Sequence, residues 1–284
     1  MHEIKLIECP RDAMQGWRKL ITTEKKIEYI NQLLKVGFDT IDFGSFVSPK
    51  AVPQMADTKE VIEQLYVKDT KTKLLAIIAN VRGAREAAGF EKIKYLGFPF
   101  SISPTFQKRN ANSTIEESLE IVKEIKNICD KNEKKLVVYI SMAFGNPYGD
   151  VYNEGIVLEW IKKITVEGIG IISLADTVGL ASPSQIVSLV KETIATFPNI
   201  ETGVHLHSTN HNWKQKLDAA FENGCVRFDG ALKGFGGCPF AEDELVGNMN
   251  TELMIPYFKR LGFLKNLDQA ELLKASQMAS EIFI

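Results

Sequence analysis

Two histidines separated by one residue, His205 and His207, are the most informative pair of side chains in the sequence. Residues two apart on a strand project to the same side, so two imidazoles on one face form half of a metal site. A hydrogen-bonded pair of core histidines is the structural alternative. The strand end and the nearby carboxylates favour the metal site.

Asp12 and Asn248 are the residues that we expect to complete this site, through a carboxylate and an amide oxygen. A mixed set of nitrogen and oxygen ligands suits Mg²⁺ or Mn²⁺, whereas Zn²⁺ more often recruits sulfur or a third imidazole. Beside Asp12, Arg11 forms either an ordinary surface ion pair or a fixed cation directed at a developing oxyanion. The second role is the stronger use of a guanidinium in a water-poor site.

Cys238 follows three glycines and precedes a proline in the segment 234–239. A lone cysteine is more often a small buried hydrophobe, but a thiol on a glycine hinge at an active rim favours catalysis. The same glycines could cradle phosphate, although no Walker lysine follows them. Asp176 is a further candidate, either to cap a loop or to orient a metal-bound group.

These residues lie far apart in the sequence, so the fold must bring them together. Short apolar runs alternate with amphipathic stretches along the chain, which predicts strands at 4–8, 38–43, 73–79, 92–98, 136–142, 170–174, 202–206 and 226–231. This alternation favours one (β/α)₈ TIM barrel over an open doubly wound sheet. The open sheet would need G-x-G-x-x-G after its first strand, where Cys9-Pro10-Arg11-Asp12 stands instead.

The single domain is expected to span 1–284, with the barrel at about 1–262 and a C-terminal helical extension at about 263–284. We expect this extension to close a barrel end rather than to dock a partner subunit. Capping boxes are predicted at Ser113 with Glu116 and at Ser182 with Gln185. Left-handed glycines are predicted to end helices at positions 37, 89, 168 and 224.

Barrel enzymes carry their reactive groups after the strands, so one mouth of the barrel should collect most of the candidates. The predicted strand ends place there Glu8, Arg11, Asp12, Gln15, Asp42, Asp176, His205, His207, Cys238 and Asn248.

Composition excludes several other classes of protein. The chain has 34 basic and 36 acidic side chains, a formal charge of −2, and no long basic run, so a nucleic-acid partner is not expected. No apolar stretch approaches the ~18–20 residues that span a bilayer, and the first residues do not have the pattern of a signal peptide. Four scattered cysteines indicate neither disulfides nor a cysteine zinc site. We therefore expect a cytoplasmic protein with reduced thiols.

Along its whole length the sequence resembles the 3-hydroxy-3-methylglutaryl-CoA (HMG-CoA) lyases, within a larger group of metal-dependent aldolase-type barrels. The resemblance lies in the segments 10–15, 45–55, 176–179, 204–207, 236–241 and 247–248. The Ser48-Pro49-Lys50 block and the glycine-cysteine-proline loop are specific to the lyases. Arg-Asp and His-x-His are shared across the larger group.

The resemblance implies that Asp12, His205, His207 and Asn248 bind a divalent metal, Mg²⁺ or Mn²⁺. It also implies a retro-Claisen cleavage of HMG-CoA, an acyl-CoA substrate, to acetyl-CoA and acetoacetate. This reaction belongs to leucine degradation and ketone-body formation. We expect the protein to act as a homodimer.

The resemblance further implies that Arg11 contacts the thioester carbonyl of the substrate and that Cys238 is the active-site thiol on a mobile loop. We expect Gln15 and Asp42 to bind substrate together with Arg11. The catalytic set would be Cys238, Arg11, Asp176 and His205, with the identity of the general base open. By position, Lys50, Lys108 and Arg109 are candidates to meet the charges of coenzyme A, although a solvated surface role fits each equally well.

Several positions depart from the family pattern. Ser208 stands where the family usually has Asp, Asp42 replaces the usual Glu, and His211 lies in a segment that normally carries glycine. Because the metal ligands are intact, these changes bear on substrate choice. Two alternatives therefore remain: a related acyl-CoA lyase or aldolase acting on another 3-hydroxy acid, and a metal-binding homologue without turnover.

Overall fold

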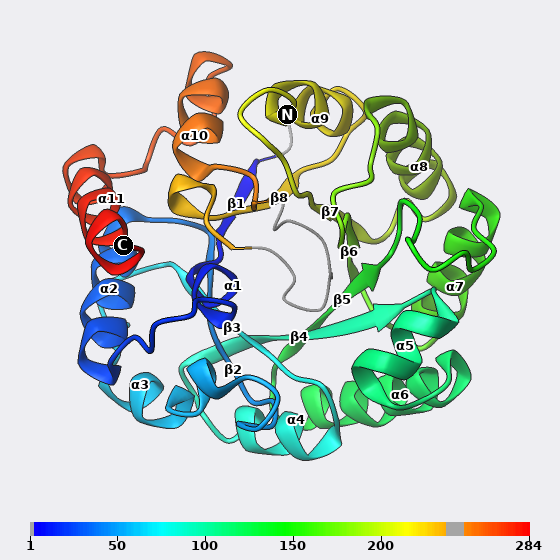
Figure 1. Ribbon diagram of the computed structural model, residues 1–284, viewed down its shortest axis with the longest axis horizontal. Coiled ribbons are helices and arrows are strands. Elements are labelled where there is room, and N and C mark those ends of the chain that lie inside the picture. The colour runs from blue at the N-terminus through cyan, green and yellow to red at the C-terminus, as the bar shows by residue number, and fades with distance from the viewer. Residues whose placement is uncertain (1–2, 237–246) are drawn as a thin grey trace.

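A closed barrel of eight parallel strands forms the centre of the computed structural model, which describes residues 3–236 and 247–284 (Figure 1). The strands follow one another around the barrel in sequence order, and β8 pairs back with β1. They are β1 Lys5–Glu8, β2 Thr40–Ser45, β3 Lys73–Ile77, β4 Ile93–Ser101, β5 Lys135–Ser141, β6 Ile171–Ala175, β7 Glu201–His205 and β8 Arg227–Gly230. The predicted (β/α)₈ barrel is confirmed.

Helices surround the barrel as an outer ring, except for the short helix α1, which lies inside that ring (Figure 1). They are α1 Pro10–Gln15, α2 Thr23–Val36, α3 Thr58–Gln64, α4 Val81–Ala88, α5 Pro104–Ala111, α6 Ile115–Lys131, α7 Glu154–Val166, α8 Pro183–Thr196, α9 Trp213–Phe221, α10 Thr251–Arg260 and α11 Gln269–Ile282. Two 3₁₀ turns, η1 Pro53–Met55 and η2 Leu232–Gly234, lie between them. Both faces of every strand are thus covered, which explains why the strands read as continuous apolar runs.

The apolar interior has two parts. The larger lies between the strands and the helical ring, and a smaller cluster of Leu75, Tyr95, Val137, Tyr139 and Ile171 forms apart from it. Its members come from neighbouring strands, β3 to β6, and each is at most 8% exposed. Inward-facing side chains fill a barrel of eight strands, so the reactive groups must gather at an end of the barrel rather than inside an open channel.

One predicted capping box is confirmed and the other is shifted by one residue. Ser182 and Gln185 bond reciprocally at the start of α8. At the start of α6 the box is formed by Thr114 and Glu117, so the prediction at Ser113 and Glu116 is wrong. The Ser113 hydroxyl instead accepts a 2.9 Å hydrogen bond from Gln107, which leaves Thr114 to cap the helix.

Three of the four predicted helix-ending glycines are left-handed: Gly37, Gly168 and Gly224 have φ of 90°, 80° and 94°. Gly89 does not, because its φ of −67° stays in the right-handed helical region. Its N–H bonds back to the carbonyl of Glu86, so the last turn of α4 simply tightens before the chain leaves the helix.

The C-terminal helix α11 packs beside α2 in the helical ring (Figure 1). The prediction that it closes a barrel end is therefore wrong, because its buried residues face a neighbouring helix. Phe283, just after α11, packs edge-on against Trp17 with ring centroids 5.3 Å apart and also contacts Phe235.

Among the described cysteines, Cys9, Cys129 and Cys225 are free and buried. Within the described part of the chain, we find no helix with the length and apolar character that crossing a bilayer would require.

Candidate metal centre at the mouth of the barrel

The short helix α1 places three of the predicted residues at the mouth. Pro10 occupies its first turn, where the missing N–H costs no hydrogen bond. The Asp12 carboxylate accepts hydrogen bonds from Arg11 Nη1 and Gln15 Nε2, each at 2.8 Å. Asn248 Nδ2 donates to its other oxygen at 2.7 Å. Residues 236 positions apart thus meet at one buried carboxylate.

The two histidines lie beside Asp12. His205 is the last residue of β7, and His207 lies two residues beyond the strand, where it forms an isolated bridge with Asn248. Their ring centroids are 5.4 Å apart. One ligand atom from each of Asp12, His205 and His207 lies within 4.8 Å of the other two. The structure therefore brings together three of the four predicted metal ligands in a single group.

The charges of this group suit a divalent cation. Burial opposes ionisation of Asp12, but the Arg11 guanidinium and the two imidazoles lower its pKa to about 2. Burial and the neighbouring His205 lower the pKa of His207 to about 4. At neutral pH the site therefore offers a carboxylate and a neutral imidazole. Among the described residues, His207 Nε2 is buried without a hydrogen-bond partner, as a nitrogen awaiting a metal would be.

The side-chain amide of Asn248 lies close to the backbone of Phe235 and Gly236. Its Nδ2 also donates to the carbonyl of Phe235 at 2.9 Å. A Cβ on Gly236 would lie 2.4 Å from this nitrogen, so only glycine fits at that position. The amide presents its nitrogen to Asp12, and a half-turn of the amide group would present the oxygen instead. Its role as a metal ligand stays a prediction.

Arg11 is held by two carboxylates. Its Nε donates to both oxygens of Asp42, at 3.2 and 3.0 Å, and its Nη2 donates to Asp42 Oδ2 at 2.5 Å. With Nη1 bound to Asp12, three of the five guanidinium N–H groups have acceptors within the described part of the chain, which leaves two for a substrate oxygen. Asp42 is 1% exposed and does not line the pocket described below, so its predicted role in substrate binding stays a prediction.

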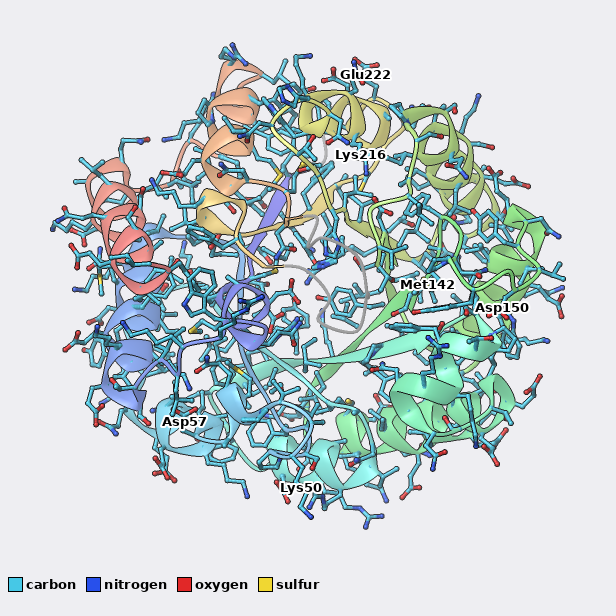
Figure 2. The ribbon with its side chains drawn as sticks, viewed as in Figure 1. Lys50, Asp57, Met142, Asp150, Lys216 and Glu222 are labelled. Atoms are coloured by element: carbon cyan, nitrogen blue, oxygen red, sulfur yellow. The ribbon has the colours of Figure 1, made fainter. Side chains whose placement is uncertain are left out.

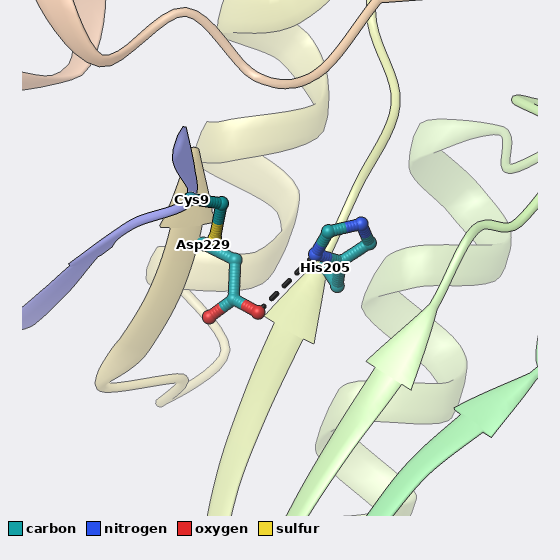
Figure 3. A group of neighbouring side chains, drawn as sticks. All are labelled: Cys9, His205 and Asp229. Atoms are coloured by element: carbon teal, nitrogen blue, oxygen red, sulfur yellow. Dashed lines mark hydrogen bonds and ion pairs between the residues drawn. The ribbon is translucent and has the colours of Figure 1, made fainter. Parts of the chain in front are cut away.

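Asp229 is a site residue that the sequence analysis missed. It lies on β8, and its Oδ2 is 3.2 Å from His205 Nδ1 (Figure 3). This contact leaves Nε2 of His205 as the nitrogen free for a metal, the usual arrangement of a metal-binding histidine. The available signal was the alternation Arg227-Phe228-Asp229, which puts polar side chains on the inward face of an otherwise apolar strand.

Cys9 forms a second group with His205 and Asp229 (Figure 3). Its thiol is buried, and burial followed by the nearby Asp229 raises its pKa well above the ordinary value. The neutral thiol that results donates weakly to the carbonyl of Ile7. Neither Cys9 nor Asp229 lines the pocket described below, whereas Asp12, His205 and His207 do, so oxygen and nitrogen atoms are the favoured donor set of the mouth.

Asp176 is placed next to the histidines but does not line the pocket described below. One of its oxygens accepts from the N–H of Ala181 at 3.0 Å and the other from Lys216 Nζ at 2.7 Å. Lys216 was also missed. It lies in α9, and no sequence pattern distinguishes it from a solvated lysine.

A pocket opens beside these groups. Its polar lining consists of Arg11, Asp12, Gln15, Ser141, Thr177, His205 and His207. Its apolar wall consists of Val47, Val52, Ile77, Phe98, Phe106 and Tyr139. Lys50, labelled in Figure 2, directly precedes Ala51 of the lining, and Lys108 and Arg109 directly precede Asn110. All three side chains are exposed. Cys238 lies outside the described residues.

The chain is similar to known proteins over almost its whole length. The sequence model of the HMGL-like family matches residues 4–279. Hydroxymethylglutaryl-CoA lyase YngG of Bacillus subtilis is 31% identical over 272 residues, covering 96% of this chain and 90% of that protein. The cytoplasmic 3-hydroxy-3-methylglutaryl-CoA lyase of Rattus norvegicus is 31% identical over 96% of this chain and 79% of its own.

Solved structures agree as well. An HMG-CoA lyase from A. baumannii, in complex with coenzyme A and 3-methylmalate, superposes with a TM-score of 0.90 at 30% identity and covers 99% of this chain and 91% of its own. The B. subtilis HMG-CoA lyase gives a TM-score of 0.91 at 30% identity, over 98% of this chain and 93% of its own. Fold and site together define a (β/α)₈ barrel with a candidate metal centre at its mouth. Within that class, the chain belongs to the HMGL-like family.

Proposed function

We propose that this protein is a divalent-metal-dependent carbon–carbon lyase that cleaves HMG-CoA to acetyl-CoA and acetoacetate. The observation that carries the proposal is the joint placement of Arg11, with two unused N–H groups, and the group formed by Asp12, His205 and His207 at one pocket. The similarity to HMG-CoA lyases over nearly the whole chain supports the same substrate.

The residues divide the reaction among them. A cation held by Asp12, His205 and His207, with Asn248 as the fourth predicted ligand, would acidify the C3 hydroxyl of the substrate. A base then takes that proton, the C2–C3 bond breaks, and its electron pair forms the enolate of the acetyl thioester. Arg11 faces the pocket with the donors needed to stabilise the enolate oxygen.

His205 lines the pocket, whereas both oxygens of Asp176 have other partners. Because Nδ1 of His205 contacts Asp229 and Nε2 is assigned to the cation, His205 acts first as a ligand, and the identity of the general base stays open. Gln15 also lines the pocket and can donate to a substrate oxygen. The apolar wall excludes water, which protects the enolate until it is protonated.

Cys238 is proposed to deliver the proton that turns the enolate carbon into the methyl group of acetyl-CoA. We expect Cys238→Ala to keep its affinity for Mn²⁺ and to lose most turnover, because the thiol acts after the metal has bound. Steady-state kinetics with HMG-CoA and a Mn²⁺ titration of the same variant measure the two effects separately. Unchanged kinetics would remove the catalytic role.

The proposal extends to the cofactor, the assembly and the location. The oxygen and nitrogen donors favour Mg²⁺ or Mn²⁺. We further propose a homodimer in the cytoplasm; the relatives include proteins named cytoplasmic and others named mitochondrial.

The test is an assay of metal-loaded protein on HMG-CoA and on a panel of other 3-hydroxyacyl-CoA esters, with and without chelator. We expect acetoacetate from HMG-CoA, and its loss on chelation. Cleavage of other esters but not of HMG-CoA would favour a related lyase, an alternative that the departures at Asp42 and Ser208 motivate. No turnover of any ester would favour a metal-binding homologue.

A further inference from the structure

Lys216 has an unusual environment for a lysine. It lies in α9 with 3% of its side chain exposed. Its ammonium donates to Asp176 Oδ2 at 2.7 Å, to the carbonyl of His207 at 2.8 Å and to the carbonyl of Gly179 at 3.3 Å. An ammonium has three N–H donors, so each finds an acceptor inside the protein.

The acceptors of the Lys216 ammonium lie in two segments of the chain. Asp176 and Gly179 follow β6, and His207 follows β7. The carbonyl of His207 is bound by Lys216, and the carbonyl of His205 accepts the backbone N–H of Asp176 at 2.9 Å. The Lys216 ammonium therefore binds the backbone of His207, and the backbone N–H of its ion-pair partner Asp176 binds that of His205. Asp176 is itself fixed by the N–H of Ala181.

His207 needs such support because the regular strand has already ended. β7 stops at His205, so at His207 the barrel ladder no longer fixes the backbone. On its other side the chain is tied by the bond from Ser208 N to the carbonyl of Gly247, at 2.8 Å. On the side of β6, the Lys216 ammonium holds the His207 carbonyl through a hydrogen bond with a charged donor, which is stronger than one between neutral groups.

We propose that Lys216 is a positioning residue of the metal centre, which holds the His207 imidazole in place by binding the His207 carbonyl. The inference rests on the proposed metal-dependent function. Lys216 does not line the pocket itself, and its hydrogen bond to His207 is to the backbone carbonyl, although its charge also acts on the His207 imidazole.

The chain contains a matched control. Lys26 is also 3% exposed, and its ammonium bonds to both oxygens of Asp57, at 2.8 and 2.9 Å, and to the backbone carbonyl of Gln54. Asp57 lies on the opposite side of the barrel from Lys216 (Figure 2). Both lysines are buried and bind a carboxylate as well as a backbone carbonyl, but only the carbonyl bound by Lys216 belongs to a candidate metal ligand.

The experiment is a titration of purified, metal-free protein with Mn²⁺, followed by electron paramagnetic resonance. We expect Lys216→Met to bind Mn²⁺ about 10–100-fold more weakly than wild type, the usual effect of removing an outer support of a metal ligand. Lys26→Met should bind Mn²⁺ as wild type does, although it loses an ion pair of the same kind. Equal weakening in the two variants would reduce Lys216 to a stabilising role and overturn the proposal.

A double variant covers the case in which Lys216→Met folds poorly because Asp176 is left as a buried, unpaired charge. In Lys216→Met/Asp176→Asn that charge is removed, so thermal stability should recover towards wild type. Mn²⁺ affinity should stay low, because the carbonyl of His207 still lacks its ammonium. Wild-type affinity in the folded double variant would overturn the role of Lys216 alone. Wild-type protein that binds no Mn²⁺ would overturn the proposed function and this inference with it.

Discussion

Two buried arginines mark opposite ends of the barrel, and their surroundings differ. At the mouth, Arg11 makes hydrogen bonds to both Asp42 and Asp12. At the start of β8, Arg227 is fully buried but makes one 3.3 Å bond, to Glu201, and its Nε and Nη2 have no partner among the described residues. The mouth is therefore organised by charge and the other end mainly by packing.

The packing at Arg227 is explicit. A Cβ on Gly203 would lie 2.9 Å from its Cδ, so the absence of a side chain at that position makes room for the arginine stem. The guanidinium lies 5.6 Å from the ring centroid of Tyr95. At the mouth, by contrast, one guanidinium faces two carboxylates, which leaves a net negative charge for a cation. The difference teaches that burial alone does not make a charged residue part of a site.

Of the substitutions proposed for this protein, Arg11→Met should change turnover and stability the most. A small effect would contradict the proposed difference between the mouth and the opposite end of the barrel. Arg11→Met removes the donors for the enolate oxygen, so we expect kcat on HMG-CoA to fall about 10²–10³-fold. It also leaves Asp42 buried without its cation, which should cost about 3–5 kcal/mol of unfolding free energy. Steady-state kinetics and urea unfolding measure the two effects. A variant as stable as wild type would contradict the view of the mouth as charge-organised.

Asp229 sharpens the comparison, because it lies between the two ends and bonds to His205. Asp229→Asn removes the carboxylate that sets which nitrogen of His205 carries the proton, so Mn²⁺ affinity should fall about 10–100-fold. Cys9→Ala is the control, since Cys9 belongs to the same group but its protonated thiol is not expected to bind the ion. If Cys9→Ala weakens Mn²⁺ binding more than Asp229→Asn does, the ion lies in the other group.

Glu8 is a buried carboxylate near the mouth without a neighbouring cation in the described part of the chain, so it shows how burial changes a carboxyl pKa. It is fully buried, accepts hydrogen bonds from Leu232 N at 2.8 Å and Thr251 Oγ1 at 2.6 Å, and forms no ion pair within the described residues. Burial raises its pKa to about 8. Asp12, only four residues further on, is equally enclosed, yet Arg11 and the imidazoles lower its pKa.

The sign of the pH effect follows from that shift. The folded protein keeps the Glu8 proton up to about pH 8, whereas the unfolded chain loses it near pH 4.5. The unfolding free energy should therefore fall as pH rises between these values, by about 1.4 kcal/mol per unit, and level off above pH 8. In Glu8→Gln this contribution should vanish. Urea unfolding of both proteins at pH 6 and 8, with chelator, gives the difference; parallel pH profiles would contradict it.

Arg227 should give the smallest effect. The one ion pair that Arg227 makes among the described residues is with Glu201, which is 20% exposed and also pairs with Lys5, so Arg227→Met leaves no ion-paired carboxylate without a cation. We expect a change of about 1 kcal/mol or less in unfolding free energy, the range of a partly solvated pair. Urea unfolding beside Arg11→Met gives a direct contrast. A loss as large as that of Arg11→Met would abolish the distinction between the two ends.

Much of this protein was determined by the sequence itself. The alternation of apolar runs and amphipathic stretches is local, so it predicted the barrel and all eight strands to within a few residues. Residue types at strand ends also indicated the mouth, and the structure brings Asp12, His205 and His207 into one group. The errors at Ser113 and Gly89 arose where a neighbouring side chain or a tightened turn decided a helix end.

Only the tertiary structure decided which groups support those residues. Asp229 and Lys216 come from β8 and α9, and their contacts with His205 and His207 depend on how adjacent strands and helices pack around the barrel. The same packing directs Asp42 to Arg11 and Asp176 to Lys216 rather than into the pocket. Hydrogen bonds between distant segments depend on distances of a few tenths of an ångström, and no periodicity in a sequence carries that information.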